Sequence, residues 1–168
     1  MYYTEWHSPL GMLTLVATPD GLRGIYFADH RHPPDRRGWQ RDDGYPALQE
    51  AISQLAAYFS GQLQQFSLKL DRSGGTAFQQ RVWQALEEIP YGQTWSYQQL
   101  ARHLGQDKAV RAVGAANGRN PLSIVVPCHR VIAASGALTG YAGGLENKMQ
   151  LLKLEAERSD ILHQYSAE

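Results

Sequence analysis

The chemistry of this chain centres on a single cysteine that is followed directly by a histidine. Cys128 is the only cysteine, and it stands between Pro127 and His129 in the stretch VVPCHRVI. A free thiol has a pKa of about 8.5, so a nucleophilic cysteine needs a neighbouring base or cation that raises its thiolate fraction. His129 is the nearest base, and a turn at Pro127 would let the two side chains meet directly or through a water molecule. Cys128 is therefore a candidate nucleophile, although a lone cysteine among valines is also typical of a buried core.

A base in such a pair is normally oriented by a third group, and Glu155 is the candidate. It follows Leu151 by four residues and Leu152 by three, which places it on or beside the inward face of a predicted final helix. Cys128, His129 and Glu155 could then form a triad. Each also has an ordinary interpretation, because Glu155 could be a solvated helix residue and His129 a hydrogen-bonded structural imidazole. Periodicity does not decide between these alternatives.

The elements of the first part of the chain are predicted to be a small antiparallel sheet and one helix. Strand-forming residues flank a Pro-Asp-Gly turn in residues 11–27, and the polar segment Asp29–Pro46 is predicted to be a surface excursion. Residues 45–61 form an amphipathic helix with Gly61 as its cap, on the spacing of Leu48, Ile52, Leu55 and Phe59. Residues 66–70 alternate as a half-buried strand, and a glycine-containing stretch places a domain boundary at residues 71–76.

The second part is predicted to be mainly helical. Thr76 and Gln79 have capping-box spacing at the start of a helix that runs to about Ile89. Ser96 caps a helix that continues through His103, and a further helix starts from Asp107 after a glycine turn. The pair is a helix-turn-helix candidate or an ordinary helical hairpin. Residues 121–127 are predicted to be a short buried strand, residues 133–144 a glycine-rich loop, and the final helix carries Leu145, Met149, Leu152 and Ala156 on one face.

Composition bounds the function classes. The 168 residues carry 16 basic and 16 acidic side chains, yet the segment 94–131 is locally basic, with Arg102, Lys108, Arg111, Arg119 and Arg130 opposed only by Asp107. A single cysteine excludes an intramolecular disulfide and a Cys-x-x-Cys zinc site, which favours a reducing cytoplasm. The start of the chain lacks the pattern of a signal peptide, and no stretch has the roughly 18 apolar residues of a membrane span.

Several stretches, in this order, resemble the O6-alkylguanine-DNA alkyltransferase family, also called methylated-DNA–protein-cysteine methyltransferases. They are FQQRVWQALEEIPYGQTWSYQQLA, AVRAVGAANGRNP, PCHRVI and TGYAGGLENK followed by LLKLE. The resemblance is close over residues 76–156 and weaker over residues 1–75. It implies an α/β (α+β) fold, in which residues 1–75 form a ribonuclease-H-like domain with a small antiparallel sheet. Residues 76–168 would form a mainly helical DNA-binding and alkyl-acceptor domain that contains the helix-turn-helix.

The resemblance implies direct-reversal DNA repair. Cys128 would attack the alkyl carbon on O6 of guanine, or on O4 of thymine, and keep the alkyl group, so that each molecule acts once. By the same resemblance, His129 assists deprotonation of the thiol through a water molecule, and Glu155 orients His129. Tyr97 donates a proton toward the departing guanine, whose developing negative charge is thereby neutralised. No cofactor is implied, and the protein would act as a monomer on double-stranded DNA.

The resemblance also assigns residues to the DNA and to the guanine pocket. The nucleotide must leave the base stack to reach the cysteine, and Arg111 would fill its place while small side chains let the second helix lie against the minor groove. The implied DNA-binding residues are Arg111, Ala112, Gly114, Ala115, Asn117, Gln98 and Ser96. The implied pocket residues are Asn120, Val131, Tyr141, Ala142 and Gly143. Some relatives have serine at the position of Ala142, so a hydroxyl contact to O6 is missing here and the range of alkyl groups stays open.

Some relatives carry a structural zinc ion in the N-terminal domain, but residues 1–75 contain no cysteine. His7, His30 and His32 are interpreted as surface residues, and no metal site is expected. Two other functions fit part of the pattern. A Cys-His-Glu hydrolase would use the same triad for acyl transfer, but it leaves the basic helix pair unexplained. A protein that only binds DNA lesions, similar to alkyltransferase-like proteins, would not need the thiol of Cys128.

Overall fold

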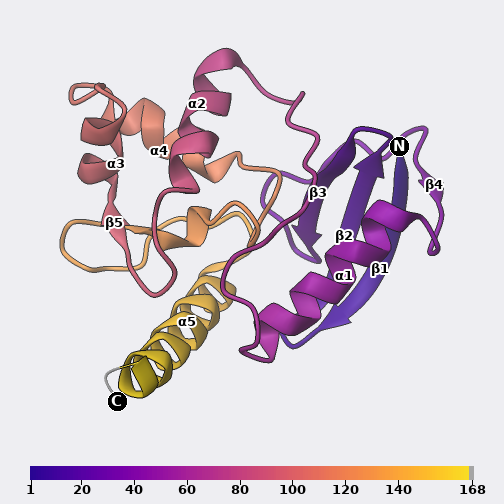
Figure 1. Ribbon diagram of the computed structural model, residues 1–168. Helices are drawn as coiled ribbons and strands as arrows, with labels where there is room; N and C mark the ends of the chain where they lie inside the picture. The colour runs from indigo at the N-terminus through magenta and orange to yellow at the C-terminus, as the bar shows by residue number, and fades with distance from the viewer. Residues whose placement is uncertain (167–168) are drawn as a thin grey trace.

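A four-stranded sheet with one helix on its face forms the first part of the molecule (Figure 1). The protein is described by a computed structural model of residues 1–166, in which side chains are described as far as residue 158. The strands are β1 (Tyr2–Ser8), β2 (Gly11–Thr18), β3 (Gly21–Phe27) and β4 (Gln40–Arg41), in the spatial order β3-β2-β1-β4. The three long strands pair antiparallel, and β4 runs parallel to β1. The predicted hairpin of β2 and β3 is confirmed. Strands β1 and β4 are not predicted from the sequence.

Helix α1 (Pro46–Phe59) packs against the sheet and closes its core. Its buried residues are Leu48, Ala51, Leu55 and Tyr58. Gly61 follows the helix with a φ of 80°, the left-handed conformation that glycine adopts most readily, so the predicted cap is confirmed. The predicted surface excursion between the hairpin and α1 contains the two residues of β4 and otherwise forms no helix or strand.

The two other strands predicted from the sequence, residues 66–70 and 121–127, are wrong. Side chains of Phe66, Leu68 and Leu70 are half-buried in alternation as expected, but only Leu70 bridges to the sheet, at Leu22 of β3. Residues 121–127 reach the same edge of β3, where Leu122 bridges to Ile25. Since each segment reaches only part of one short edge, neither gains the run of backbone hydrogen bonds that makes a strand.

Residues 121–127 instead fold as a series of tight turns. Backbone amides of Val125 and Val126 donate to the carbonyls of Ser123 and Leu122, at 2.9 Å in both cases. Ile124, which follows Ser123 in these turns, has a φ of 74°, a strained conformation for a β-branched residue. The apolar run is buried as predicted, but its backbone reverses direction before it reaches the cysteine.

Helices α2 (Ala77–Leu86), α3 (Tyr97–His103) and α4 (Val110–Gly118) form the second part, together with the short strand β5 (Trp95–Ser96). Both predicted N-terminal caps are present as complete capping boxes, Thr76 with Gln79 and Ser96 with Gln99. Helix α2 ends three residues earlier than predicted, because residues 87–89 form turns ahead of Pro90. Helix α4 begins at Val110, not at Asp107, because a turn closed by the Ala109 amide on the Gln106 carbonyl at 2.8 Å comes first.

The chain then passes through a single 3-10 turn, η1 (Cys128–Arg130), into strand β6 (Val131–Ile132), which pairs with β5. The predicted loop follows and leads into α5 (Leu145–Ser166). The inward face of α5 differs from the predicted one, because Leu145 and Met149 are exposed while Lys148, Leu151 and Glu155 are buried. None of the described helices is both long enough and apolar enough to cross a membrane. The last two residues of the predicted second domain lie outside the described residues.

Candidate active site

The 3-10 turn η1 holds Cys128 in the buried interior, where the turn lies against α2 and α5. Cys128 is 5% exposed, and its amide donates to the carbonyl of Val126 at 2.8 Å. The amide of Arg130 donates to the carbonyl of Pro127 at 3.0 Å, which closes the turn that the proline favours. The expected turn at Pro127 is therefore confirmed. Because of this turn, the side chains of Cys128 and His129 do not point to opposite faces, as they would in a flat strand.

A buried carboxylate orients the imidazole of His129. Nε2 of His129 lies 2.8 Å from Oε2 of Glu155, and the two residues are 0% and 1% exposed. Arg130 donates to the same carboxylate through Nε at 2.8 Å and through NH2 at 3.0 Å. Burial acts to raise the pKa of Glu155, but its interactions with His129 and Arg130 outweigh burial and lower the pKa to about 2. Glu155 is therefore an ionised acceptor, as the triad requires.

The ionised acceptor fixes which nitrogen of His129 is basic. Because Nε2 faces the carboxylate, it carries the proton in the neutral ring, and Nδ1 keeps its lone pair. Nδ1 is buried and has no partner among the described residues. Burial lowers the pKa of His129 against the opposing effect of Glu155, so the ring is neutral at neutral pH. The arrangement provides a general base on the residue next to the thiol.

The thiol of Cys128 is protonated in the resting protein. Burial raises its pKa to about 11, although Asn120 and the charge of Lys148 act in the opposite direction. No direct hydrogen bond joins Cys128 to His129 in the part of the chain that the structure describes. Proton transfer from sulfur to Nδ1 therefore needs a bridging group, and a water molecule can serve as one.

Lys148 is a buried cation beside the thiol that the sequence analysis did not single out. Its ammonium group donates to the carbonyls of Val131 at 2.6 Å and Thr139 at 3.0 Å. Burial lowers the pKa of Lys148 to about 8. The lysine thus ties the strand after the cysteine to the glycine-rich loop. The spacing could have indicated this position, since Lys148 lies seven residues before Glu155 and therefore on the same side of a helix. The inward face predicted from the sequence did not include Lys148.

The glycine-rich loop, residues 133–144, is held by contacts from both parts of the chain. The hydroxyl of Tyr97 donates to the carbonyl of Thr139 at 3.0 Å. From the first part of the chain, the amide of Arg31 donates to the carbonyl of Ala142 at 2.7 Å. The ring of Tyr141 lies edge-on to Phe27 with centroids 5.9 Å apart. A Cβ atom at Gly143 would lie 2.6 Å from Cε2 of Phe27, so this close approach requires glycine.

The residues predicted to line a guanine pocket lie before Cys128 (Asn120), in β6 after it (Val131) and on the glycine-rich loop (Tyr141, Ala142, Gly143). Asn120 is buried, donates to the carbonyl of Val126 at 2.8 Å and accepts from the amide of Leu122 at 3.1 Å. It therefore braces the turns that precede the cysteine. Val131 and Tyr141 are buried, and Ala142 and Gly143 lie on the loop opposite.

Helices α3 and α4 are the helix-turn-helix candidate, and α4 presents small exposed side chains. Arg111, Ala112 and Ala115 of α4 are exposed. Gly114 lies next to the ring of Tyr97, and a Cβ atom at this glycine would lie 3.4 Å from Cδ1 of that ring. In the connection, the side chain of Gln98 donates to the carbonyl of Asp107 at 3.4 Å. The hydroxyl of Ser96 accepts from the amide of Gln99 at 3.0 Å and caps α3.

Asn117 does not share that exposed surface. It is 4% exposed and donates to the carbonyl of Cys128 at 3.4 Å, from a different face of α4 than Arg111. The expectation that Asn117 contacts DNA does not fit this position, because its amide faces the active-site turn. His30 also differs from its interpretation as a surface residue, since it is half-buried and accepts from the amide of Phe27 at 3.4 Å. Within the described residues there is no cluster of three or more metal-ligating side chains.

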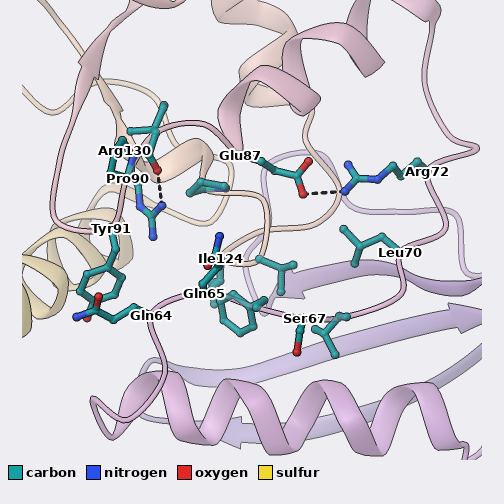
Figure 2. A pocket seen from close by; sticks show the side chains of 15 residues that line it. Gln64, Gln65, Ser67, Leu70, Arg72, Glu87, Pro90, Tyr91, Ile124 and Arg130 are labelled. Atoms are coloured by element: carbon teal, nitrogen blue, oxygen red, sulfur yellow. Dashed lines mark hydrogen bonds and ion pairs between the residues drawn. The ribbon is translucent and has the colours of Figure 1, made fainter.

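A hollow of about 680 Å³ lies beside the active-site turn (Figure 2). Pro127 and Arg130 line it from the turn, and the segment 64–72 lines it from the first part of the chain. An ion pair of Arg72 with Glu87 at 2.7 Å spans one end. Cys128, Tyr97 and Tyr141 are not among its lining residues, so this hollow does not include the candidate nucleophile.

Two family models match the chain. Residues 1–72 match the ribonuclease-like domain of 6-O-methylguanine DNA methyltransferase, and residues 77–157 match the DNA-binding domain of the same family. A methylated-DNA–protein-cysteine methyltransferase of Mycobacterium leprae is 53% identical over 148 residues, which cover 88% of each chain. Its counterpart in Methanosarcina acetivorans is 48% identical and covers 92% of this chain and 98% of its own.

Solved structures agree with these matches. The OGT of Mycobacterium tuberculosis, crystallised in complex with DNA, has a TM-score of 0.89 and 49% identity over 94% of both chains. The O6-methylguanine-DNA methyltransferase of Pyrococcus kodakaraensis is more distant, with a TM-score of 0.62 and 27% identity over 92% of this chain and 98% of that chain. Both the fold class and the order of the two parts match those of the mycobacterial structure.

Proposed function

This chain belongs to the 6-O-methylguanine-DNA methyltransferase family, and on that premise we propose that Cys128 is the residue that accepts the alkyl group. The activity is DNA repair by transfer of a methyl group from methylated DNA to a protein cysteine. One observation carries the proposal: the chain has a single cysteine, so a reaction that ends on its own cysteine has one acceptor. The buried His129–Glu155 pair beside that cysteine supports the same assignment.

The first step is removal of the thiol proton. A water molecule that bridges the sulfur and Nδ1 of His129 passes the proton to the imidazole, and the resulting imidazolium is stabilised by Glu155. The charge of Lys148 favours the thiolate that remains. Because burial keeps the thiol protonated at rest, the sulfur becomes strongly nucleophilic only when this relay operates.

In the transfer step, the sulfur of Cys128 forms a bond to the alkyl carbon as the bond from that carbon to O6 of guanine breaks. The electron pair of the broken bond stays on the guanine. Tyr97 donates its phenolic proton toward the departing base, and the proton held by His129 restores the phenol through solvent. Burial raises the pKa of Tyr97, which keeps it a proton donor. The products are an unmodified guanine and a thioether at Cys128, so each molecule acts once.

The substrate is double-stranded DNA that contains O6-alkylguanine, and O4-alkylthymine is a second substrate of the same class. The damaged nucleotide must rotate out of the duplex, at a cost of a few kcal/mol. The exposed residues Arg111, Ala112 and Ala115 support a role of α4 in this step, since small side chains allow close approach while Arg111 fills the vacated stack. Arg102, Lys108 and Arg119, all exposed, add the positive charge that phosphates need.

We further propose two domains, residues 1–75 and 76–168, which act together as a monomer. The acceptor Cys128 and the base His129 are side chains of the protein itself, so the proposed reaction needs no cofactor. A reducing cytoplasm is the compartment in which a single reactive thiol persists.

The test is the intact mass of the protein after mixing with duplex DNA that carries one O6-methylguanine. We expect one methyl group per molecule, mapped to Cys128 and absent from Cys128→Ala, which should still bind the DNA. Tight binding with no change of mass would indicate a recognition protein. An unchanged mass without binding would favour a hydrolase.

A further inference from the structure

The carboxylate of Glu155 receives a donor from the first part of the chain. The hydroxyl of Tyr58, near the end of α1, donates to Oε2 of Glu155 at 2.6 Å. This is the oxygen that faces Nε2 of His129 at 2.8 Å. The two bonded residues are 97 positions apart in the sequence and both are buried. One of the hydrogen bonds that orient this carboxylate therefore comes from α1, in addition to those from His129 and Arg130.

Packing fixes the position of the Tyr58 hydroxyl. Three aromatic rings surround the ring of Tyr58, with centroid distances of 5.2 Å to Phe59, 5.4 Å to Phe66 and 6.2 Å to Tyr91. Burial and the neighbouring carboxylate raise the pKa of Tyr58 well above its ordinary value. The hydroxyl therefore keeps its proton and acts as a donor throughout the neutral range.

We propose that Tyr58 is a positioning residue for the alkyl transfer, whose hydroxyl holds Glu155 in the orientation that His129 requires. This inference rests on the proposed function. The hydrogen bond has two effects on the relay. It limits rotation of the carboxylate, and it occupies part of the electron density of Oε2, which moderates how strongly Glu155 stabilises the imidazolium of His129.

The test compares Tyr58→Phe with Tyr91→Phe. Both changes remove one hydroxyl from the same aromatic cluster, but the hydroxyl of Tyr91 is buried and has no partner among the described residues. We expect Tyr58→Phe to lower the single-turnover rate of methyl transfer about tenfold, the loss typical of one hydrogen bond to a charged group. The Kd for lesion-containing DNA should change less than about twofold, and Tyr91→Phe should leave both quantities within about twofold.

The pH profile separates positioning from a purely structural role. The groups that face His129 are Glu155 and Lys148 from α5 and Arg130 from its own turn. Without the Tyr58 donor, the carboxylate stabilises the imidazolium more strongly, so the acidic limb of the transfer rate should move to higher pH. In Tyr58→3-fluorotyrosine the ring and hydroxyl are kept but the donor is stronger, so the limb should move to lower pH. This second variant gives an answer even where Tyr58→Phe does not fold.

A double-mutant cycle with His129→Gln completes the test. If Tyr58 acts through the base, Tyr58→Phe should change the residual transfer rate of His129→Gln by less than about twofold. Equal slowing in both backgrounds, or an acidic limb that neither Tyr58 variant moves, would overturn the proposal. Failure of wild-type protein to methylate Cys128 would instead refute the proposed function. Methylation of Cys128 that is slowed by His129→Gln but not by Tyr58→Phe would refute this inference alone.

Discussion

Nε2 of His129 lies 2.8 Å from Oε2 of Glu155 inside a region that excludes solvent from both side chains. The pair therefore titrates as part of the folded core. Its protonation state links the stability of the protein to the chemistry of Cys128, because the form of His129 that can accept the thiol proton is also the form that burial favours.

The first prediction is that the protein loses stability on acidification. The folded-state pKa of His129 is lowered from 6.5, and that of Glu155 is lowered from 4.5 to about 2, so the unfolded chain binds more protons at both sites. The stability is present above these unfolded values and is lost as pH falls through 6.5 and then 4.5. Denaturant unfolding from pH 7.5 to pH 4 measures the effect.

His30 contributes with the same sign, because burial lowers its pKa to about 4. The variant His129→Gln isolates the contribution of His129 to the pH dependence of the free energy of unfolding. In this variant the curve of stability against pH should be flatter just below pH 6.5. A curve of unchanged shape in His129→Gln would show that His129 is not buried in its neutral form.

The second prediction concerns proton donation by Tyr97. Tyr97→Phe should slow methyl transfer from duplex DNA about a hundredfold, which is within the range of general acid catalysis. The change also removes the hydrogen bond to Thr139, so a slower reaction alone would not identify the role. Rates measured with a substrate whose leaving group needs no proton should fall far less. Equal losses with both substrates would assign Tyr97 to the shape of the loop.

The third prediction is that Lys148 holds the glycine-rich loop against β6. Lys148→Met removes the donor that joins the carbonyls of Val131 and Thr139 and leaves them without this partner. We expect a loss of stability of about 1–3 kcal/mol from the buried carbonyl of Val131 and at least a tenfold slower transfer. Lys153→Met, at an exposed position of the same helix, is the matched control and should change neither quantity. Wild-type rates in Lys148→Met would contradict the prediction.

The fourth prediction separates base flipping from chemistry. Arg111→Ala should slow transfer from duplex DNA about tenfold or more, because nothing then fills the vacated stack. Transfer from the free base O6-methylguanine should be unchanged, since no duplex has to open. Arg81→Ala removes an exposed arginine of α2 and serves as the control for lost charge. A parallel loss with the free base would place Arg111 in the pocket instead.

Local sequence determined the pieces of this protein that depend on neighbouring residues. The hairpin follows from its turn residues, and the helices begin where Thr76 and Ser96 cap them. The turn at Cys128 follows from Pro127, and the same short stretches carried the resemblance to the family that the comparisons support. Each of these features is decided by contacts within a few positions of the chain.

Tertiary structure decided which polar groups meet in the core. Tyr58 and Glu155 are 97 positions apart, and no periodicity relates them. The inward face of α5 includes Lys148 because backbone carbonyls of β6 and the loop satisfy its charge, a partnership that exists only after packing. Residues 66–70 and 121–127 are not strands, because both meet one edge of β3. Local patterns predict elements, but a buried polar side chain takes its role from whichever distant group satisfies it.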